Sequence, residues 1–238
     1  MLNLDRQELL RLRYKQINPR YQPALELYRA WMDECVTGES CLLDAGCGPG
    51  GLVKQYVGLA RQVIGADRYV TAFHRDAEIH TLTEADLSAL PFPANQFDLI
   101  TCSWVLEHLA DPLAVFREYA RVLKTGGRVM FITPNKSNYV VWMRRVIPNL
   151  MSKGIVRAIY GRDEHFINPT YYRANTQRDI DRLMTTAGLR PERFAHVSDP
   201  TYLAFNELLF RVSIAIEAVI ERAAPRGKVH LVGMCVKP

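Results

Sequence analysis

Residues Leu42 to Gly51 read LLDAGCGPGG, a short apolar run that ends in an acid and leads into four glycines. The glycines fit two spacings at once: Gly46, Gly48 and Gly51 give G-x-G-x-x-G, whereas Gly46, Gly48 and Gly50 give G-x-G-x-G. A glycine-rich turn at the carboxyl end of a first buried strand places a ligand over that edge of the sheet, against the N-terminus of the next helix. The stretch therefore predicts a ligand-binding edge and leaves the ligand open.

Apolar runs and helical patterns alternate around this stretch. The runs SCLLDA, QVIGAD, FDLITCS and RVMFITP read as strands, and TEADLSALPF contains a short third strand that closes at Asp86. Near the end, RFAHV and KVHLVGMCVK read as two more strands with the helix NELLFRVSIAIEAVIER between them. This alternation predicts an α/β fold with a mostly parallel sheet covered by helices.

Capping residues mark the ends of several helices. Asp111 is an N-cap followed by Pro112, and its helix is expected to run to the glycine pair 126–127. Thr176 begins another helix that ends at Gly188. Two helices before the first strand are expected to break near Asn18, where Tyr14, Tyr21 and Trp31 would either line a roof over the ligand or pack beneath it.

The composition narrows the class of protein. With 238 residues, 48% of them hydrophobic, the chain can bury a full core, and a net charge of +5 is too small to demand nucleic acid. The five cysteines form no C-x-x-C pair, so neither a disulfide framework nor a zinc site is expected. The first residues contain no apolar leader and no later run of about 18 apolar residues exists, so a cytoplasmic protein is predicted.

Acidic residues at three successive strand ends discriminate between ligands. Asp44 precedes the first glycine, where a carboxylate would repel the pyrophosphate of a dinucleotide but attract the ammonium and sulfonium of S-adenosylmethionine (SAM). Asp67 stands where a carboxylate accepts the two hydroxyl protons of a ribose, which both cofactors contain. Asp86 is placed to accept from an adenine amino group while Leu87 packs beside the ring. The set favours SAM.

The motifs LLDAGCGPG, VIGAD, EADLSALPF, FDLITCSWVLEHLADP and LKTGGRVMFITPN resemble, in order, those of the class I SAM-dependent methyltransferases. More narrowly, they are similar to the branch that contains ubiquinone and menaquinone biosynthesis methyltransferases and many small-molecule O-methyltransferases. The resemblance covers roughly residues 40 to 135 and implies a Rossmann-like, seven-stranded sheet with helices on both faces and an antiparallel last strand. It also implies a set of cofactor-binding residues: Asp44, Gly46, Cys47, Gly48, Asp67, Arg68, Asp86, Leu87 and Ser103.

His108, in EHLADP, is the candidate catalytic residue. A histidine after the fourth strand suits a general base that removes the proton of an acceptor hydroxyl. The competing interpretation is that His108 braces the loop before the Asp111 helix by bonding a loop carbonyl. A metal site formed by Glu107 with His108 is a weaker alternative, but a second cluster at the right spacing is missing, so no metal is expected.

The chain is expected to be one methyltransferase domain in four parts: an N-terminal helical cap (1–38), a SAM-binding core (39–135), a lid insertion (136–175) and the C-terminal part of the sheet with its helices (176–238). Within the insertion, a basic helical face either contacts a lipid-like acceptor or anionic membrane surface, or is the solvated edge of a partly buried helix; its residues are Arg145, Lys153 and Arg157. The acceptor-binding candidates are His165, Tyr171, Tyr172 and Arg173.

The sequence as a whole predicts a SAM-dependent methyltransferase, monomeric or homodimeric, that acts on a small organic acceptor. The hydroxyl of a phenol, sugar, polyketide or quinone precursor is favoured. Carbon or nitrogen methylation is the alternative, because such acceptors need no base. A protein that binds SAM without transferring its methyl group is an alternative of another class, and a dinucleotide oxidoreductase is the least favoured.

Overall fold

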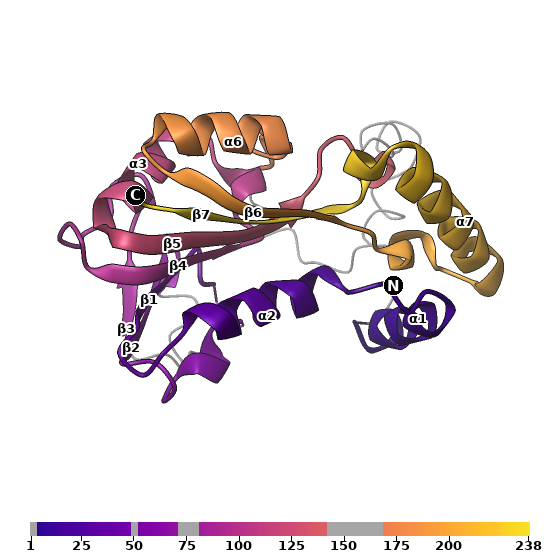
Figure 1. Cartoon of the computed structure of the whole chain (residues 1–238), viewed down its shortest axis with the longest axis horizontal. Coiled ribbons are helices and arrows are strands. Elements are labelled where there is room, and N and C mark those ends of the chain that lie inside the picture. Colours follow the sequence, from indigo (N-terminus) through magenta and orange to yellow (C-terminus); the bar gives the residue numbers. More distant parts are fainter. Residues whose placement is uncertain (1–3, 49–51, 71–80, 142–168) are drawn as a thin grey trace.

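The computed structural model describes residues 4–48, 52–70, 81–141 and 169–238. Within them, seven strands form one sheet in the order β3-β2-β1-β4-β5-β7-β6, in which β7 is antiparallel to both neighbours and the other pairs are parallel (Figure 1). The strands are β1 (Cys41–Ala45), β2 (Gln62–Asp67), β3 (Thr81–Glu84), β4 (Phe97–Ser103), β5 (Leu123–Pro134), β6 (Arg190–Val197) and β7 (His230–Val236). The predicted Rossmann-like sheet with an antiparallel last strand is confirmed.

Helices cover both faces of the sheet (Figure 1). The α-helices are α1 (Leu4–Ile17), α2 (Ala24–Cys35), α3 (Pro112–Val122), α6 (Gln177–Thr186) and α7 (Glu207–Ala223). Short 3-10 helices are η1 (Lys54–Tyr56), η3 (Leu106–His108), η6 (Pro200–Leu203) and η7 (Pro225–Gly227). Helices α3 and α6 lie on one face and α2 on the other, whereas α1 packs with η6 and α7 beyond the ends of β6 and β7. None of the described helices combines the length and apolar character that a bilayer crossing requires.

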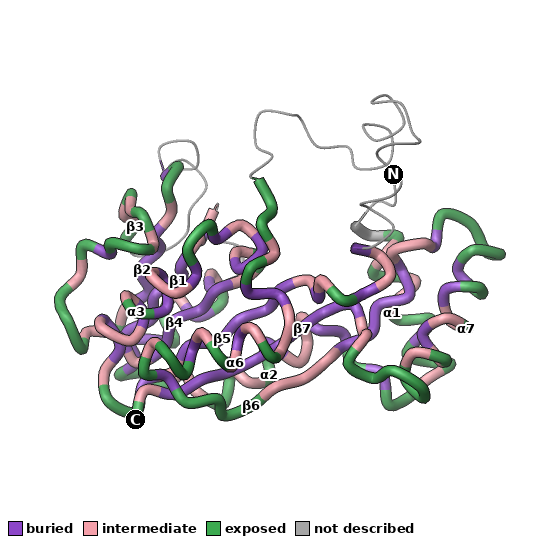
Figure 2. Tube along the Cα trace, turned by 90° about the horizontal axis from the view of Figure 1, so that it is seen from above, coloured by how far each residue is buried: buried purple, intermediate pink, exposed green. Residues whose placement is uncertain are grey.

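Alternating side chains of the strands divide the core into two layers. Leu43 packs in the same cluster as Phe116 of α3, and its neighbour Leu42 packs in the cluster of Met32 of α2. Burying each such side chain contributes about 1.5–3 kcal/mol. The inner strands β1 and β7 are buried along their whole length, whereas the edge strand β3 is partly exposed (Figure 2). The core therefore lies along the middle of the sheet and holds the carboxyl ends of the inner parallel strands in place.

The predicted helix starts are present and one predicted end is wrong. Asp111 Oδ1 accepts from Ala114 N at 3.1 Å, and Thr176 caps α6 through Asp179 N at 3.1 Å. Helix α3, however, ends at Val122 and not at the glycine pair. The backbone N–H of Gln96 donates to the Val122 carbonyl at 2.8 Å, so the chain turns into β5 four residues early.

Two further differences lie near the ligand edge. Strand β3 ends at Glu84, which leaves Asp86 in the following loop. In residues 52–61, behind the glycine turn, the described chain contains only the three-residue η1 in place of a full helix. Tyr56 is buried under the sheet, and Gly58, with a φ of +88°, turns the chain out of the helical conformation. The expected helix N-terminus behind the glycines is therefore not among the described residues.

Candidate functional site

The candidate site lies at the carboxyl ends of β1 and β4. Strand order reverses between these two strands, because the chain proceeds from β1 to β2 and β3 on one side and returns at β4 on the other. Ligands of open α/β sheets bind in the crevice at such a reversal. Asp44 and Gly46 come from the end of β1, and Ser103 is the last residue of β4. The sheet topology thus brings the first and fourth motifs together.

Asp44 is a buried carboxylate with one hydroxyl partner. Its side chain is 4% exposed, and Oδ1 accepts a hydrogen bond from Thr101 Oγ1 at 2.7 Å. Burial, with a smaller contribution from the charge of Asp67, raises the pKa of Asp44 to about 6. A carboxylate held this far from water gains strongly from a neighbouring cation. The ammonium of a methionine moiety is such a cation.

The glycine turn is fixed to its neighbours by close packing and backbone bonds. Gly46 has a φ of +77°, and a Cβ built on it would lie 2.4 Å from Val105 Cγ2, so a larger residue does not fit there. The Gly48 N–H donates to Asp67 Oδ2 at 2.9 Å. Cys47 between them is buried, and burial raises the pKa of its thiol to about 12, which keeps the sulfur protonated. Residues 49–51, which include Gly50 and Gly51, lie outside the described residues.

Asp67 and Asp86 are both oriented by local hydrogen bonds. Asp67 Oδ1 accepts from Tyr69 N at 3.0 Å while its other oxygen binds the glycine turn. Asp86 Oδ1 accepts from the backbone N and the hydroxyl of Ser88 at 2.9 and 2.7 Å, and Oδ2 lies 2.6 Å from Arg68 Nη2. The bonds from Ser88, and then Arg68, lower the pKa of Asp86. Both carboxyl groups keep acceptor lone pairs that these bonds do not use.

Two observations test whether this edge suits SAM. Ser103 Oγ is buried and lacks a geometrically sound hydrogen-bond partner among the described residues, so a polar ligand group at the end of β4 would satisfy it. Leu87 packs against the α3 side of the core beside Asp86, which provides an apolar contact next to a hydrogen-bond acceptor. Together with the buried Asp44, this edge offers a carboxyl group, a hydroxyl without a sound partner in the described chain and an apolar contact, which are groups of the kind that a ligand with an ammonium and an aromatic base needs.

His108 is held by a loop carbonyl. Its Nδ1 lies 3.0 Å from the carbonyl oxygen of Pro169. Because a carbonyl oxygen only accepts, Nδ1 must carry the proton, and the neutral ring then has its lone pair on Nε2. The expected loop contact is therefore present, and it leaves the other ring nitrogen in the form that a base requires.

Glu107 organises the same loop from beneath. Its buried Oε2 accepts from Thr133 Oγ1 at 2.8 Å, and its backbone oxygen accepts from the N–H groups of Tyr171 and Tyr172 at 2.8 and 3.2 Å. The side chains of Glu107 and His108 thus contact different segments. In the described part of the chain, no group of three or more His, Cys, Asp or Glu side chains is arranged to hold a metal ion.

A hollow of about 540 Å³ lies beside this loop, between the start of α3 and the first two turns of α6. We call it the α3–α6 hollow. Three of the four residues expected to bind the acceptor line it: Tyr171, Tyr172 and Arg173. The fourth, His165, and the basic residues Arg145, Lys153 and Arg157 lie outside the described residues.

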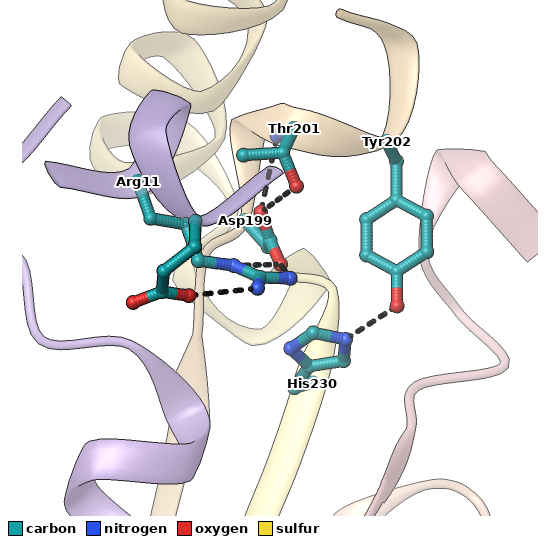
Figure 3. A network of polar contacts seen from close by, with 6 residues as sticks. Arg11, Asp199, Thr201, Tyr202 and His230 are labelled. Carbon is teal, nitrogen blue, oxygen red and sulfur yellow. Dashed lines mark hydrogen bonds and ion pairs between the residues drawn. The ribbon is translucent and has the colours of Figure 1, made fainter. Parts of the chain in front are cut away.

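Two aromatic side chains at the same edge, Trp104 and His230, were not predicted as site residues from the sequence. Trp104 follows β4 with a φ of +59°, and its ring centroid lies 5.0 Å from that of His230, edge to face. His230 is the first residue of β7, and its Nε2 lies 2.8 Å from the hydroxyl oxygen of Tyr202 (Figure 3). Burial lowers the pKa of His230 to about 4, so the ring is neutral at pH 7. Trp104, directly after the fourth predicted strand, was the signal in the sequence.

The N-terminal helices pack beside this edge. Arg11 of α1 binds Asp199 Oδ2 through Nη2 at 2.8 Å and Nε at 3.2 Å, and Asp199 also accepts from Thr201 (Figure 3). The rings of Tyr14 and Tyr21 are 4.6 Å apart in a cluster with residues of η6 and α7. Of the two roles left open for these tyrosines, the structure shows packing. Trp31 of α2 packs against the core cluster on the α2 face of the sheet, and the guanidinium of Arg193 lies 5.7 Å from its ring centroid.

A family model described as a methyltransferase domain matches residues 43–131, which include Asp44, the glycine turn and the end of β4. The chain carries a class I SAM-dependent methyltransferase domain. The recognition made from the motifs is confirmed, and with it SAM as the cofactor of this domain.

Curated relatives point to the same branch. The chain is 35% identical over 133 residues to a ubiquinone biosynthesis O-methyltransferase of Albidiferax ferrireducens, in a match that covers 51% of this chain and 50% of the relative. It is 30% identical over 156 residues to the protein of that name from Pseudomonas putida, with 58% and 66% covered. The chain thus spans about half to two thirds of the length of these curated relatives.

Solved structures show the same fold. A geranyl diphosphate C-methyltransferase from Streptomyces coelicolor A3(2), in complex with Mg²⁺, geranyl diphosphate and S-adenosyl-L-homocysteine, superposes with a TM-score of 0.57. The match covers 89% of this chain and 77% of the other at 17% identity, so it shows the fold alone.

Proposed function

We propose that the protein transfers the methyl group of SAM to a hydroxyl oxygen of a small organic acceptor. SAM supplies the methyl group and leaves as a neutral thioether, so the protein aligns the two reactants and excludes water. Asp44, Gly46 and Gly48 line the methionine moiety, and Ser103 faces its amino group. Asp67 holds the ribose, and Asp86 with Leu87 holds the adenine.

One observation carries the choice of oxygen as the accepting atom. His108 donates through Nδ1 to Pro169, which leaves the lone pair of the neutral ring on Nε2, where no described residue accepts or donates a hydrogen bond and a hydroxyl proton could be taken up. A carbon or amine acceptor would need no base at this position. The names of the curated O-methyltransferase relatives support the same choice.

The acceptor can be identified by thermal-shift profiling in the presence of S-adenosylhomocysteine (SAH), with phenols, catechols, sugars and amines as the panel. A bound acceptor raises the melting temperature with the logarithm of its concentration over Kd. Incubation with SAM and mass spectrometry of the product then locate the new methyl group. Methylation at carbon or nitrogen would contradict the proposal, and SAH binding without any turnover would favour a SAM-binding protein.

Two variants distinguish a catalytic role of His108 as a general base from a structural role in holding the loop at Pro169. His108→Ala should lower kcat by about 10²- to 10⁴-fold while the Kd of SAH stays unchanged. His108→Asn keeps a donor for the Pro169 carbonyl but has no base, so its kcat should be as low as that of the Ala variant. If His108 only braces the loop, the Asn variant should keep its turnover and the Ala variant should melt at a lower temperature.

The proposal also includes the expected setting of the enzyme: the cytoplasm, a monomer or homodimer, and no nucleic-acid partner. All five cysteines are free thiols, which supports a reducing compartment. Contact with a lipid-like acceptor or membrane would be tested by sedimentation with anionic vesicles at low salt. Wild-type protein that stays in the supernatant would exclude the contact.

A further inference from the structure

The α3–α6 hollow has the size of a small-molecule site. Its volume, about 540 Å³, falls within the range of about 300–1,000 Å³ that ligand sites occupy. Three cationic side chains line it, Lys136, Arg173 and Arg182, against the two carboxylates Asp111 and Asp179. The lining therefore has an excess of one positive charge.

Asp179 is already neutralised within the lining. Lys136 Nζ lies 3.0 Å from Asp179 Oδ2, and Arg182 Nη2 lies 3.6 Å from Oδ1. Partial burial alone would raise the pKa of Asp179, but the bonds from Thr176 and Lys136 outweigh it and lower that pKa. Asp179 thus stays ionised and is paired with Lys136 and Arg182. Its charge is not available to a third cation.

Arg173 has no carboxylate partner among the described residues. One guanidinium nitrogen, Nη1, donates to the carbonyl oxygen of Ala110, and the guanidinium lies 5.5 Å from the ring centroid of Tyr171. An arginine carries five N–H donors in a planar fork, so most of them remain for a ligand. Asp111, the other carboxylate of the lining, accepts from Ala114 N as the cap of α3. Among the three cations of the lining, Arg173 is therefore the one that is not paired with a carboxylate of the described residues.

The loop that carries Arg173 also holds the candidate base. Pro169, which fixes His108, precedes Arg173 by four residues, and four residues span at most about 14 Å. Between them, the N–H groups of Tyr171 and Tyr172 are tied to the Glu107 carbonyl, with Tyr172 at a φ of +51°. Residues 169–173 are thus held to the segment 107–110 by hydrogen bonds at Pro169, Tyr171, Tyr172 and Arg173.

We propose that the methyl acceptor carries an anionic group, a carboxylate or a phosphate, which the fork of Arg173 binds in the α3–α6 hollow. Such anions accept two parallel N–H bonds from one guanidinium. This inference rests on the proposed function in one respect, namely that the bound anion is part of the methyl acceptor. Anion binding itself is independent of methyl transfer and is measured without turnover.

Isothermal titration calorimetry tests the proposal with four probes: phenyl phosphate, benzoate, phenol and inorganic phosphate. Wild-type protein saturated with SAH should bind phenyl phosphate or benzoate at least tenfold more tightly than phenol and inorganic phosphate. Arg173→Gln should weaken that binding about tenfold and leave the Kd of SAH unchanged, since one charge-assisted contact is lost. Arg173→Lys, which keeps the charge without the fork, should fall between the two.

Arg178→Gln is the matched control, because Arg178 is an exposed arginine at the start of α6 outside the lining of the hollow. It should bind every probe as the wild type does. Equal binding of phenol and phenyl phosphate, or unchanged binding in a folded Arg173→Gln protein, would overturn the proposal. Inorganic phosphate bound as tightly as phenyl phosphate would overturn the acceptor's role. Loss of SAH binding with intact anion binding would instead refute the proposed function.

Discussion

The buried carboxylate of Asp44 should make cofactor affinity depend on pH. Its pKa in the free protein is about 6, and the ammonium of SAM or SAH requires the ionised form. At pH 5 about nine in ten free molecules carry the proton on Asp44, and at pH 7 about one in ten do. In the complex we expect the ligand to return the pKa of Asp44 to the ordinary value near 3.9. The proton must leave before the ligand binds. Affinity should therefore fall about tenfold from pH 7 to pH 5.

Calorimetric titration with SAH across pH 5 to 8 measures this effect, since SAH has the ammonium and does not react. Near pH 5, binding should also release close to one proton, which is read from buffers of different ionisation enthalpy. Asp44→Asn should bind weakly at every pH and release no proton, because its amide still accepts from Thr101 but carries no charge. A wild-type Kd that is the same at pH 5 and pH 7, or an Asn variant with the same pH profile, would refute the reasoning.

The same carboxylate should lower the stability of the protein without its cofactor. The folded pKa of about 6 exceeds the unfolded value near 3.9, so the folded state binds the proton more tightly between these values. Stability is therefore lost as pH rises through 6, by about 3 kcal/mol at neutrality. Asp44→Asn should unfold at higher urea concentration than the wild type at pH 7 without ligand. A lower midpoint for the variant would show that Asp44 is not a buried charge.

Three further perturbations address other parts of the site. Asp67→Ala should weaken SAH binding by about 1.5–3 kcal/mol, because buried ribose hydroxyls lose a charged acceptor; an unchanged Kd in calorimetry would place the ribose elsewhere. Gly46→Ala should destabilise the protein by about 1–3 kcal/mol in urea unfolding. Adding Val105→Ala removes the steric clash with the new methyl group but not the strain of the φ of +77°, so a double-mutant cycle should show only part of the stability restored. The folded pKa of His230, about 4, lies below the ordinary 6.5, so the stability it contributes is complete above pH 6.5 and is lost as pH falls towards 4. His230→Gln should remove about 3 kcal/mol of that pH dependence in urea unfolding, and parallel curves for the two proteins would contradict the assignment.

Local signals predicted the strands and the helix caps well. Asp111 and Thr176 cap their helices as expected, because capping needs only residues three positions apart. The strands follow from the alternation of apolar runs and helical patterns, and the antiparallel last strand follows from the family resemblance. Asp44 and Ser103 lie at the same edge of the sheet because β1 and β4 are parallel neighbours. These features depend on short stretches of chain or on a repeated topology.

Features set by distant contacts were not predicted. The end of α3 is fixed by an N–H from Gln96, 26 residues away from its acceptor Val122, and the glycine pair misled the sequence analysis. The contact between Trp104 and His230 joins residues 126 positions apart, so no local pattern announces it. The excess of cations in the α3–α6 hollow was not predicted either, because the sequence does not show which carboxylates lie near Arg173 in the folded protein.

The place of β7 between β5 and β6 has a consequence for the order of assembly. In the described sheet β6 pairs only with β7, although β7 is made later and follows η6, α7 and η7. A growing chain can therefore pair β1 with β2 and β4 and join Asp44 to Ser103 while β6 still lacks a partner. The arrival of His230 at the head of β7 closes the sheet and gives Trp104 its neighbour. Strand β7, the last to be made, thus joins β6 to the rest of the sheet, and both the pairing of β6 and the contact of Trp104 with His230 depend on it.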